Sequence, residues 1–171
     1  MGDVTIERYS GGESELGQLA ELLRDSVDGG ASVGFLPPLA EEEARGYWQP
    51  VLAEAAGGAR VLLVARQHGR IVGTVQLALE RRPNGRHRAE VQKLLVHRSV
   101  RRQGIARRLM AAIEAEARAA GRTLLVLDTL EGHAAEQLYP AIGYVRAGRI
   151  PQFARTPDGL EATVVFYKVL D

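Results

Sequence analysis

The chain has 171 residues, which suits one domain with its own core, and 46% apolar and 25% charged residues, which is typical of a globular protein. Its formal net charge is +1, so no overall field attracts nucleic acid and any basic function must be local. It has no cysteine, which excludes disulfides, thiolate metal sites and a cysteine nucleophile.

The N-terminal segments predict one strand, one helix and a loop. Residues 4–9 alternate apolar and polar side chains, as a half-buried strand does. Residues 14–28 have helical spacing, with Ser14 as the expected N-cap and two glycines directly after the end. Residues 31–39 contain too much glycine and proline for a regular element, so we expect an apolar loop there.

A second helix and a run of strands follow. Residues 40–58 return to helical spacing, although Pro50 should kink or split that helix. From residue 60 to residue 96, three apolar runs are separated by His-Gly and Pro-Asn-Gly turn signals. This pattern predicts an antiparallel meander of three strands.

The C-terminal part predicts alternating helices and strands. Residues 102–120 have an apolar face of helical period and end at a glycine, and residues 123–129 form a compact apolar strand. A helix that leads back to a strand beside the meander is a crossover, which favours one parallel pair. Residues 133–143 should form a short helix, and residues 144–150 and 162–170 two closing strands. We therefore predict one α/β domain, mostly antiparallel, over residues 1–171.

Five arginines surround Gly104 between residues 98 and 108, and three interpretations compete for them. They are a solvated helix face, a nucleic-acid patch, or a phosphate cradle in which a turn and a helix N-terminus present backbone N–H groups to an anion. Cations at a helix N-terminus are unfavourable unless a bound anion compensates them. The exposed helix face offers alanine and glutamate rather than side chains that read bases. The phosphate cradle is therefore favoured.

The pattern Arg101-x-x-Gly104-x-Ala106, preceded by the strand VQKLLV, resembles the acetyl-CoA-binding motif of the GCN5-related N-acetyltransferases (GNAT). The later stretch EQLYPAIGYVRAG is similar to the next motif of that family. The resemblance implies a GNAT fold over the whole chain. In that fold a central, mixed, mostly antiparallel sheet of about seven strands is splayed after the fourth strand and flanked by about four helices.

The resemblance also implies the binding site of acetyl-CoA as cosubstrate. Backbone N–H groups of the arginine loop would bind the pyrophosphate, with Arg101 and Arg102 as charged support, and the backbone of the preceding strand would pair with the pantetheine arm. The implied cofactor-binding residues are Leu94, Leu95, Val96, Arg101, Arg102, Gln103, Gly104, Ile105 and Ala106.

The same resemblance assigns the catalytic candidates. Tyr139 occupies the place of the tyrosine that protonates the departing thiolate. Asp128 and Glu90 are alternative general bases, acting directly or through water, and both stay open. With neither cysteine nor a recognisable Ser-His-Asp order, we expect direct attack in a ternary complex rather than an acyl-enzyme.

The acceptor is expected to lie between residues 28–39, the helix that holds Tyr47 and Trp48, and residues 150–159. Stretches such as GGASVGFL and TPDG resemble tabtoxin-resistance acetyltransferases of the same family, which implies a small amino-acid-like or antibiotic acceptor, attacked through an amine or a hydroxyl. A protein or peptide N-acetyltransferase and a non-catalytic CoA-binding module are the alternatives.

The remaining expectations concern partners and location. No set of His, Asp and Glu has metal-ligand spacing, so we expect no metal. We expect no nucleic acid and no membrane partner, and a cytoplasmic protein, because the sequence shows neither a signal-like segment nor a long apolar run. A homodimer is compatible with the sequence.

Overall fold

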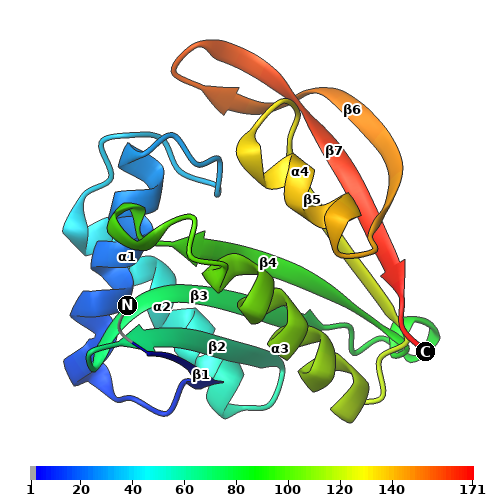
Figure 1. The fold of residues 1–171 in the computed structure, drawn as a ribbon, viewed down its shortest axis with the longest axis horizontal. Coiled ribbons are helices and arrows are strands. Elements are labelled where there is room, and N and C mark those ends of the chain that lie inside the picture. Colours follow the sequence, from blue (N-terminus) through cyan, green and yellow to red (C-terminus); the bar gives the residue numbers. More distant parts are fainter. Residues whose placement is uncertain (1–2) are drawn as a thin grey trace.

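A seven-stranded mixed sheet organises the chain, in the order β1-β2-β3-β4-β5-β7-β6 (Figure 1). The computed structural model describes residues 3–171. Only the β4–β5 pair is parallel among the described strands, which confirms the predicted fold class. The strands are β1 (Val4–Arg8), β2 (Arg60–Gln67), β3 (Arg70–Leu79), β4 (Arg88–Val96), β5 (Leu124–Leu130), β6 (Val145–Thr156) and β7 (Gly159–Val169).

Four α-helices cover the two faces of the sheet. They are α1 (Leu16–Asp28), α2 (Glu41–Ala56), α3 (Ile105–Ala119) and α4 (Ala134–Ala141). The apolar stripes of α1 and α2 pack on one face, in a core around Leu19 and Trp48, and α3 packs on the other face around Leu109. Two cores therefore hold the sheet between them. In the described part of the chain, no helix is both long and apolar enough to cross a membrane.

The structure contradicts an N-cap at Ser14 and a split of the second helix at Pro50. Ser14 lies inside a short 3-10 helix, Glu13–Glu15, and α1 begins after it without a side-chain cap. Pro50 does not split α2, which runs unbroken. The carbonyl that Pro50 leaves without a partner belongs to Gly46, and both residues are exposed, so water can satisfy that carbonyl.

Helix α3 begins three residues later than predicted. Arg102 and Gly104 have φ angles of +62° and +74°, which are left-handed conformations that a right-handed helix cannot contain. The closing hairpin is also longer than the sequence indicates. Its strands β6 and β7 reach towards residues 156–159, and two irregularities interrupt their register near residues 147 and 151–153.

The sheet opens between its fourth and fifth strands. β4 and β5 pair only over residues 88–90 and 124–126, after which β5 follows β7 and β4 follows β3 (Figure 1). The predicted splay is therefore present. It divides the sheet into two arms and leaves one edge of β4 without a strand beside it beyond Glu90.

Candidate functional site

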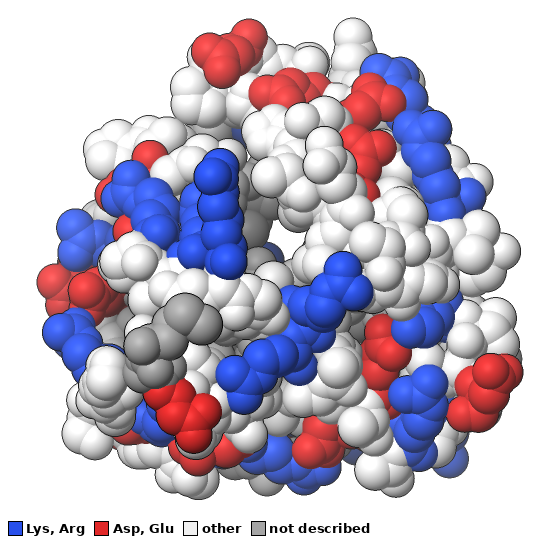
Figure 2. All heavy atoms as spheres, in the orientation of Figure 1, with Lys and Arg blue, Asp and Glu red and all other residues white. Residues whose placement is uncertain are grey.

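A cavity of about 800 Å³ lies where the sheet opens. Figure 2 shows the molecule hollowed between its two arms, with lysine and arginine side chains along the rim. The walls come from residues 31–36, helix α2, the start of β2, residues 90–94 of β4, residues 128–130 of β5, helix α4 and the tip of the β6–β7 hairpin. Segments far apart in the sequence thus meet at one site.

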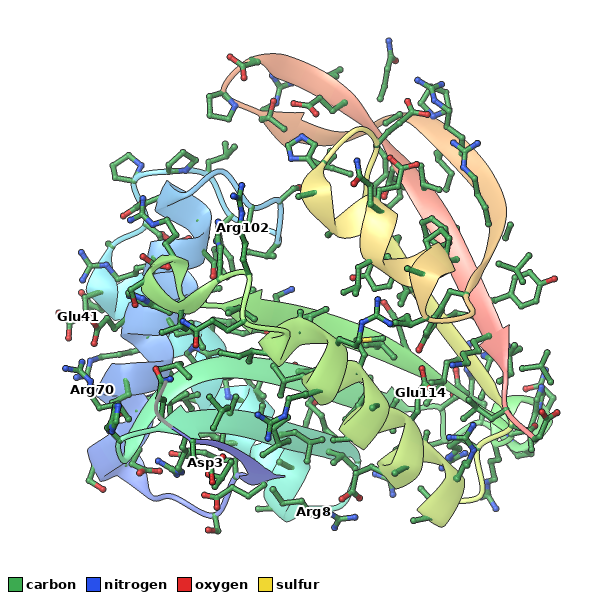
Figure 3. All side chains as sticks on the ribbon, viewed as in Figure 1. Asp3, Arg8, Glu41, Arg70, Arg102 and Glu114 are labelled. Atoms are coloured by element: carbon green, nitrogen blue, oxygen red, sulfur yellow. The ribbon has the colours of Figure 1, made fainter. Side chains whose placement is uncertain are left out.

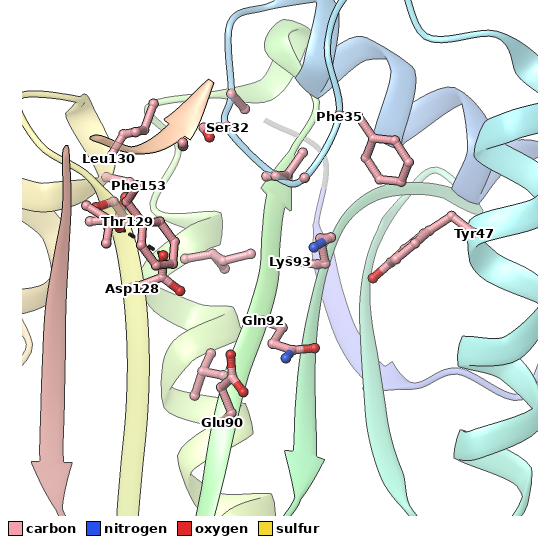
Figure 4. A pocket seen from close by; sticks show the side chains of 18 of the residues that line it. Ser32, Phe35, Tyr47, Glu90, Gln92, Lys93, Asp128, Thr129, Leu130 and Phe153 are labelled. Atoms are coloured by element: carbon pink, nitrogen blue, oxygen red, sulfur yellow. Dashed lines mark hydrogen bonds between the residues drawn. The ribbon is translucent and has the colours of Figure 1, made fainter. Parts of the chain in front are cut away.

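A β-bulge in β4 shapes the floor of this cavity. The register of β4 against β3 shifts between Thr74 and Gln76, so that Lys93 and Leu94 face a single residue of β3. Lys93 has a φ of +50°, and its carbonyl accepts a hydrogen bond from the Thr74 hydroxyl at 3.1 Å. The bulge breaks the alternation of the strand. Leu94 packs partly against the core of α3 and also borders the cavity, and the neighbouring Gln92 and Lys93 line the cavity as well (Figure 4).

Lys93 therefore points into the cavity instead of the core. Its ammonium lies 5.3 Å from the centroid of the Tyr47 ring, a cation–π contact. Burial lowers the pKa of Lys93, and the charge of Arg60 lowers it further, while Asp128 and Glu90 oppose the shift. The sequence analysis missed this residue, because a regular strand would have placed Lys93 on the same face as Val91. Nothing in the sequence indicates the positive φ angle of Lys93.

A fixed polar wall stands beside Lys93. Arg60 donates to Gln76 Oε1 and Gln92 Oε1, both at 2.7 Å, and its Nε donates to Glu54 at 2.7 Å. Buried Gln76 in turn donates to the Tyr47 hydroxyl at 3.1 Å. Burial raises the pKa of Tyr47, so its phenol is neutral near pH 7. The Arg60 charge is thus already matched by Glu54.

The opposite wall carries Asp128 and Tyr139. The Thr163 hydroxyl lies 2.8 Å from Asp128 Oδ2 and 2.9 Å from the Thr129 carbonyl, and it can donate its proton to either. Tyr139 is 6% exposed and packs against the rings of Tyr144 and Phe166. Burial, with a smaller effect of Asp128, raises the pKa of Tyr139 to about 12. This phenol consequently keeps its proton at neutral pH.

The loop between β4 and α3 presents free backbone donors. Within residues 3–171, the N–H groups of residues 104–107 have no protein acceptor, and the first α3 bond runs from the Arg108 N–H to the Gly104 carbonyl. A Cβ at Gly104 would meet no atom within 4 Å, so the space in front of the turn is open. Figure 3 places Arg102 on this loop, at the side of the opening. Backbone donors at a helix N-terminus suit a phosphate.

Three arginines of this region are tied to the protein. Arg101 Nε donates to the Val96 carbonyl at 3.1 Å. Arg107 donates to the Ala141 carbonyl at 3.5 Å, and Arg108 donates to the Val4 carbonyl on β1. The last two side chains thus point towards other elements.

The structure groups the predicted residues in two places. Glu90, Leu94, Asp128 and Tyr139 line the cavity, whereas residues 101–106 lie outside its lining, on the loop before α3. The side chain of Leu95 is buried in the core of α1 and α2 and does not line the cavity, and Leu95 is paired with Thr74 of β3. Trp48 is fully buried in the same core, so of the two aromatic residues in α2 only Tyr47 reaches the cavity.

Further cavity residues carried no signal in the sequence. Besides Lys93, the sequence analysis missed Arg60 and Gln92, because nothing in a β meander marks which polar residues face a ligand. His133 also lines the cavity, and its Nε2 lies 3.2 Å from a Glu161 carboxylate oxygen. The described residues hold no group of three or more His, Asp or Glu side chains placed to bind one metal ion.

Comparisons with known proteins agree on one kind of relative. A family model described as "Acetyltransferase (GNAT) family" matches residues 29–144. An uncharacterized N-acetyltransferase from the hisH-hisA intergenic region of Azospirillum brasilense is 37% identical over 134 residues, which are 77% of this chain and 78% of that protein.

Solved structures resemble the fold over nearly the whole chain. An N-acetyltransferase from Staphylococcus aureus Mu50 has a TM-score of 0.84 at 19% identity and covers 99% of both chains. The structure of yncA from Salmonella typhimurium, which contains its cofactor acetyl-CoA, has a TM-score of 0.80 at 19% identity and covers 99% of this chain and 95% of its own. At these identities the likeness concerns the fold alone.

Proposed function

The chain belongs to the acetyltransferase (GNAT) family, and from this premise we propose that it transfers the acetyl group of acetyl-CoA to an amine of a small polar acceptor bound in the cavity. One observation carries the proposal. Asp128 and Tyr139 line the same cavity as the unpaired edge of β4, so a base and an acid candidate meet beside a strand edge that can hold an extended ligand.

Acetyl-CoA is proposed to bind along the opening of the sheet. The backbone N–H groups at the start of α3 and the positive end of the helix would hold its pyrophosphate. The pantetheine arm would pair with the backbone of Leu94 and Val96, beyond the last β4–β5 pair. In this arrangement the pantetheine arm would run from the α3 loop along β4, and the thioester would lie at the cavity wall.

The reaction needs two proton transfers. The acceptor nitrogen attacks the thioester carbonyl, a C–N bond forms and the C–S bond breaks. The amine proton passes to Asp128 or Glu90, directly or through water. Tyr139 donates its proton to the departing thiolate, and the phenol holds that proton at neutral pH because burial raises its pKa to about 12. The Tyr139 phenolate then takes up a proton from solvent.

The acceptor proposed here is small and amino-acid-like. Support comes from the charged and polar side chains in the cavity lining, such as Asp128 and Lys93, and from the sequence stretches that resemble tabtoxin-resistance acetyltransferases. Protection against an antibiotic or toxin with an amino-acid skeleton is the narrower form of this proposal.

Two measurements test the function. Free CoA thiol is followed with a panel of small amines, hydroxyl compounds and peptides, and we expect turnover with small amines. Intact mass after incubation with acetyl-CoA alone should show unmodified protein. Stable acetylation of the protein would contradict direct attack and indicate an acyl-enzyme intermediate. Turnover of peptides alone would contradict a small acceptor and indicate a peptide or protein acetyltransferase. Acetyl-CoA binding without turnover on any acceptor would indicate a non-catalytic module.

A further inference from the structure

Lys93 carries an ammonium that the protein leaves without a hydrogen-bond acceptor. Among residues 3–171 its Nζ forms no hydrogen bond and no ion pair, and it lies 5.3 Å from the centroid of the Tyr47 ring. The Nζ also lies close to the loop above, because a Cβ at Gly34 would be 4.0 Å from it. A lysine has three N–H donors, and a half-buried one needs an acceptor.

Two unfavourable features coincide at this residue. Its backbone is left-handed at φ +50°, which is uncommon outside glycine, asparagine and aspartate, and its charged group is partly removed from water. Both result from the bulge that turns Lys93 out of the α3 core and into the cavity. The chain thus places an unpaired cation in the wall of the cavity, where a ligand can bind it.

Charges of opposite sign stand on the two sides of the cavity. Lys93 lies beside Tyr47 and the loop of residues 31–36, while Asp128 comes from β5 on the far side of the opening (Figure 4). The two groups influence each other electrostatically but form no ion pair. Arg60, the neighbouring cation, is occupied by Glu54 and two glutamines. A complementary ligand therefore has an anion near Lys93 and an amine near Asp128.

We propose that Lys93 binds a carboxylate of the acceptor, which makes amino carboxylates, meaning amino acids and their close analogues, the substrate class. This inference rests on the proposed function, because it takes the occupant of the cavity to be the acetyl acceptor. Lys93 is a specificity-determining residue in this scheme. It orients the acceptor so that the amine lies towards Asp128 and the thioester, and it takes no part in the proton transfers.

The test compares matched acceptors and matched variants. Each amino acid is paired with its carboxamide and with the decarboxylated amine, and kcat/KM is measured by CoA release. For the wild type we expect about tenfold or greater preference for the carboxylate, the size of a lost charge-assisted bond. Lys93→Met should remove this preference, and Lys93→Arg should keep part of it.

Arg70→Met is the control variant, because Arg70 is an exposed cation that does not line the cavity. It should keep the preference. Thermal stabilisation by each acceptor, with acetyl-CoA bound, gives a second readout that does not need turnover. Carboxylates should stabilise the wild type more than carboxamides do, and this difference should vanish in Lys93→Met.

The outcomes separate the two proposals. Turnover without a carboxylate preference overturns the role of Lys93 and leaves acetyl transfer in place. If no acceptor is turned over, the proposed function fails, and equal stabilisation by carboxylates and carboxamides then overturns the inference as well. Lys93→Met could also lose as much affinity for acetyl-CoA as for the acceptor. Lys93 would then bind the cosubstrate, and the inference that it binds the acceptor carboxylate would be overturned.

Discussion

The two halves of the site are built from different parts of the chain. The α3 side offers backbone N–H groups at a turn with a left-handed glycine, and three nearby arginines, Arg101, Arg107 and Arg108, bond to carbonyls of the protein. The proposed acceptor side consists of side chains from several segments, set at fixed positions by a bulge and a hydrogen-bonded wall. A site made of backbone N–H groups can form in many sequences, whereas a site made of side chains depends on the residues of this particular sequence.

The largest effect should come from a single substitution that blocks the backbone half of the site. Gly104→Glu should weaken acetyl-CoA binding about a hundredfold or more, because it places a carboxylate at the phosphate position and strains a left-handed turn. The fold should survive, since a Cβ there meets nothing within 4 Å. Isothermal titration with acetyl-CoA and a thermal melt measure the two effects.

Gly104→Asn is the matched control for that variant. Asparagine tolerates the left-handed conformation and adds no charge, so its affinity should fall much less than that of the glutamate variant. Similar losses in both variants would indicate that the turn needs glycine for close approach rather than for charge.

The next largest effect should come from Tyr139→Phe. We expect kcat to fall about 100-fold while the dissociation constant of acetyl-CoA stays the same, because phenylalanine keeps the packing against Tyr144 and Phe166 and loses only the proton donor. Steady-state kinetics and titration provide both numbers. An unchanged kcat would remove Tyr139 from the mechanism.

The raised pKa of Tyr139 also gives a stability prediction. A tyrosine that ionises near pH 10 when unfolded and near pH 12 when folded contributes stability that is fully present below pH 10 and is lost as the pH rises towards 12. Denaturant unfolding of the wild type and of Tyr139→Phe should show a shallower alkaline decline in the variant. Parallel declines would mean that the phenol ionises equally easily in both states.

A smaller effect should distinguish the two base candidates. Asp128→Asn should lower kcat about tenfold, since Glu90 or water can still accept the proton, and Glu90→Gln should lower it less. The reason for this order is that the charge of Asp128 acts on both Tyr139 and Lys93, so it lies between the acid candidate and the proposed acceptor site. The reverse order in kcat would assign the base to Glu90.

The smallest effect should come from the arginines of α3. Arg107→Gln should change acetyl-CoA affinity less than about threefold, because its guanidinium bonds to the Ala141 carbonyl and an exposed charge contributes little. A loss comparable to that of Gly104→Glu would show that a diffuse basic patch, not the backbone, binds the cosubstrate.

The sequence predicted the backbone half of the site better than the acceptor half. Gly104 and the flanking strand and helix patterns fixed the location of the α3 loop, although Arg102 and Gly104 delay the helix start because their φ angles are positive. Glu90, Asp128 and Tyr139 do line one cavity, as an enzyme site requires. Their catalytic roles stay predictions.

Residues 31–36, Tyr47 and residues 153–155 line the cavity, as expected for the acceptor region, but Lys93 was missed for a physical reason. Strand alternation predicts which side chains share a face only while the register is regular, and the bulge at Lys93 ends that regularity without a glycine or proline to mark it. The full burial of Trp48 is likewise set by how α2 packs on the sheet, which helical spacing alone does not show.

The short β4–β5 pairing has a consequence for the folded state as a whole. Beyond Glu90, β4 is an edge strand inside the molecule, so its amides on that side should exchange rapidly with deuterium until a ligand covers them. Under the proposed function that ligand is acetyl-CoA, and at a hundredfold excess over its dissociation constant it would add about 2.7 kcal/mol to the free energy of unfolding. The persistence of the protein would then follow the metabolic supply of acetyl groups.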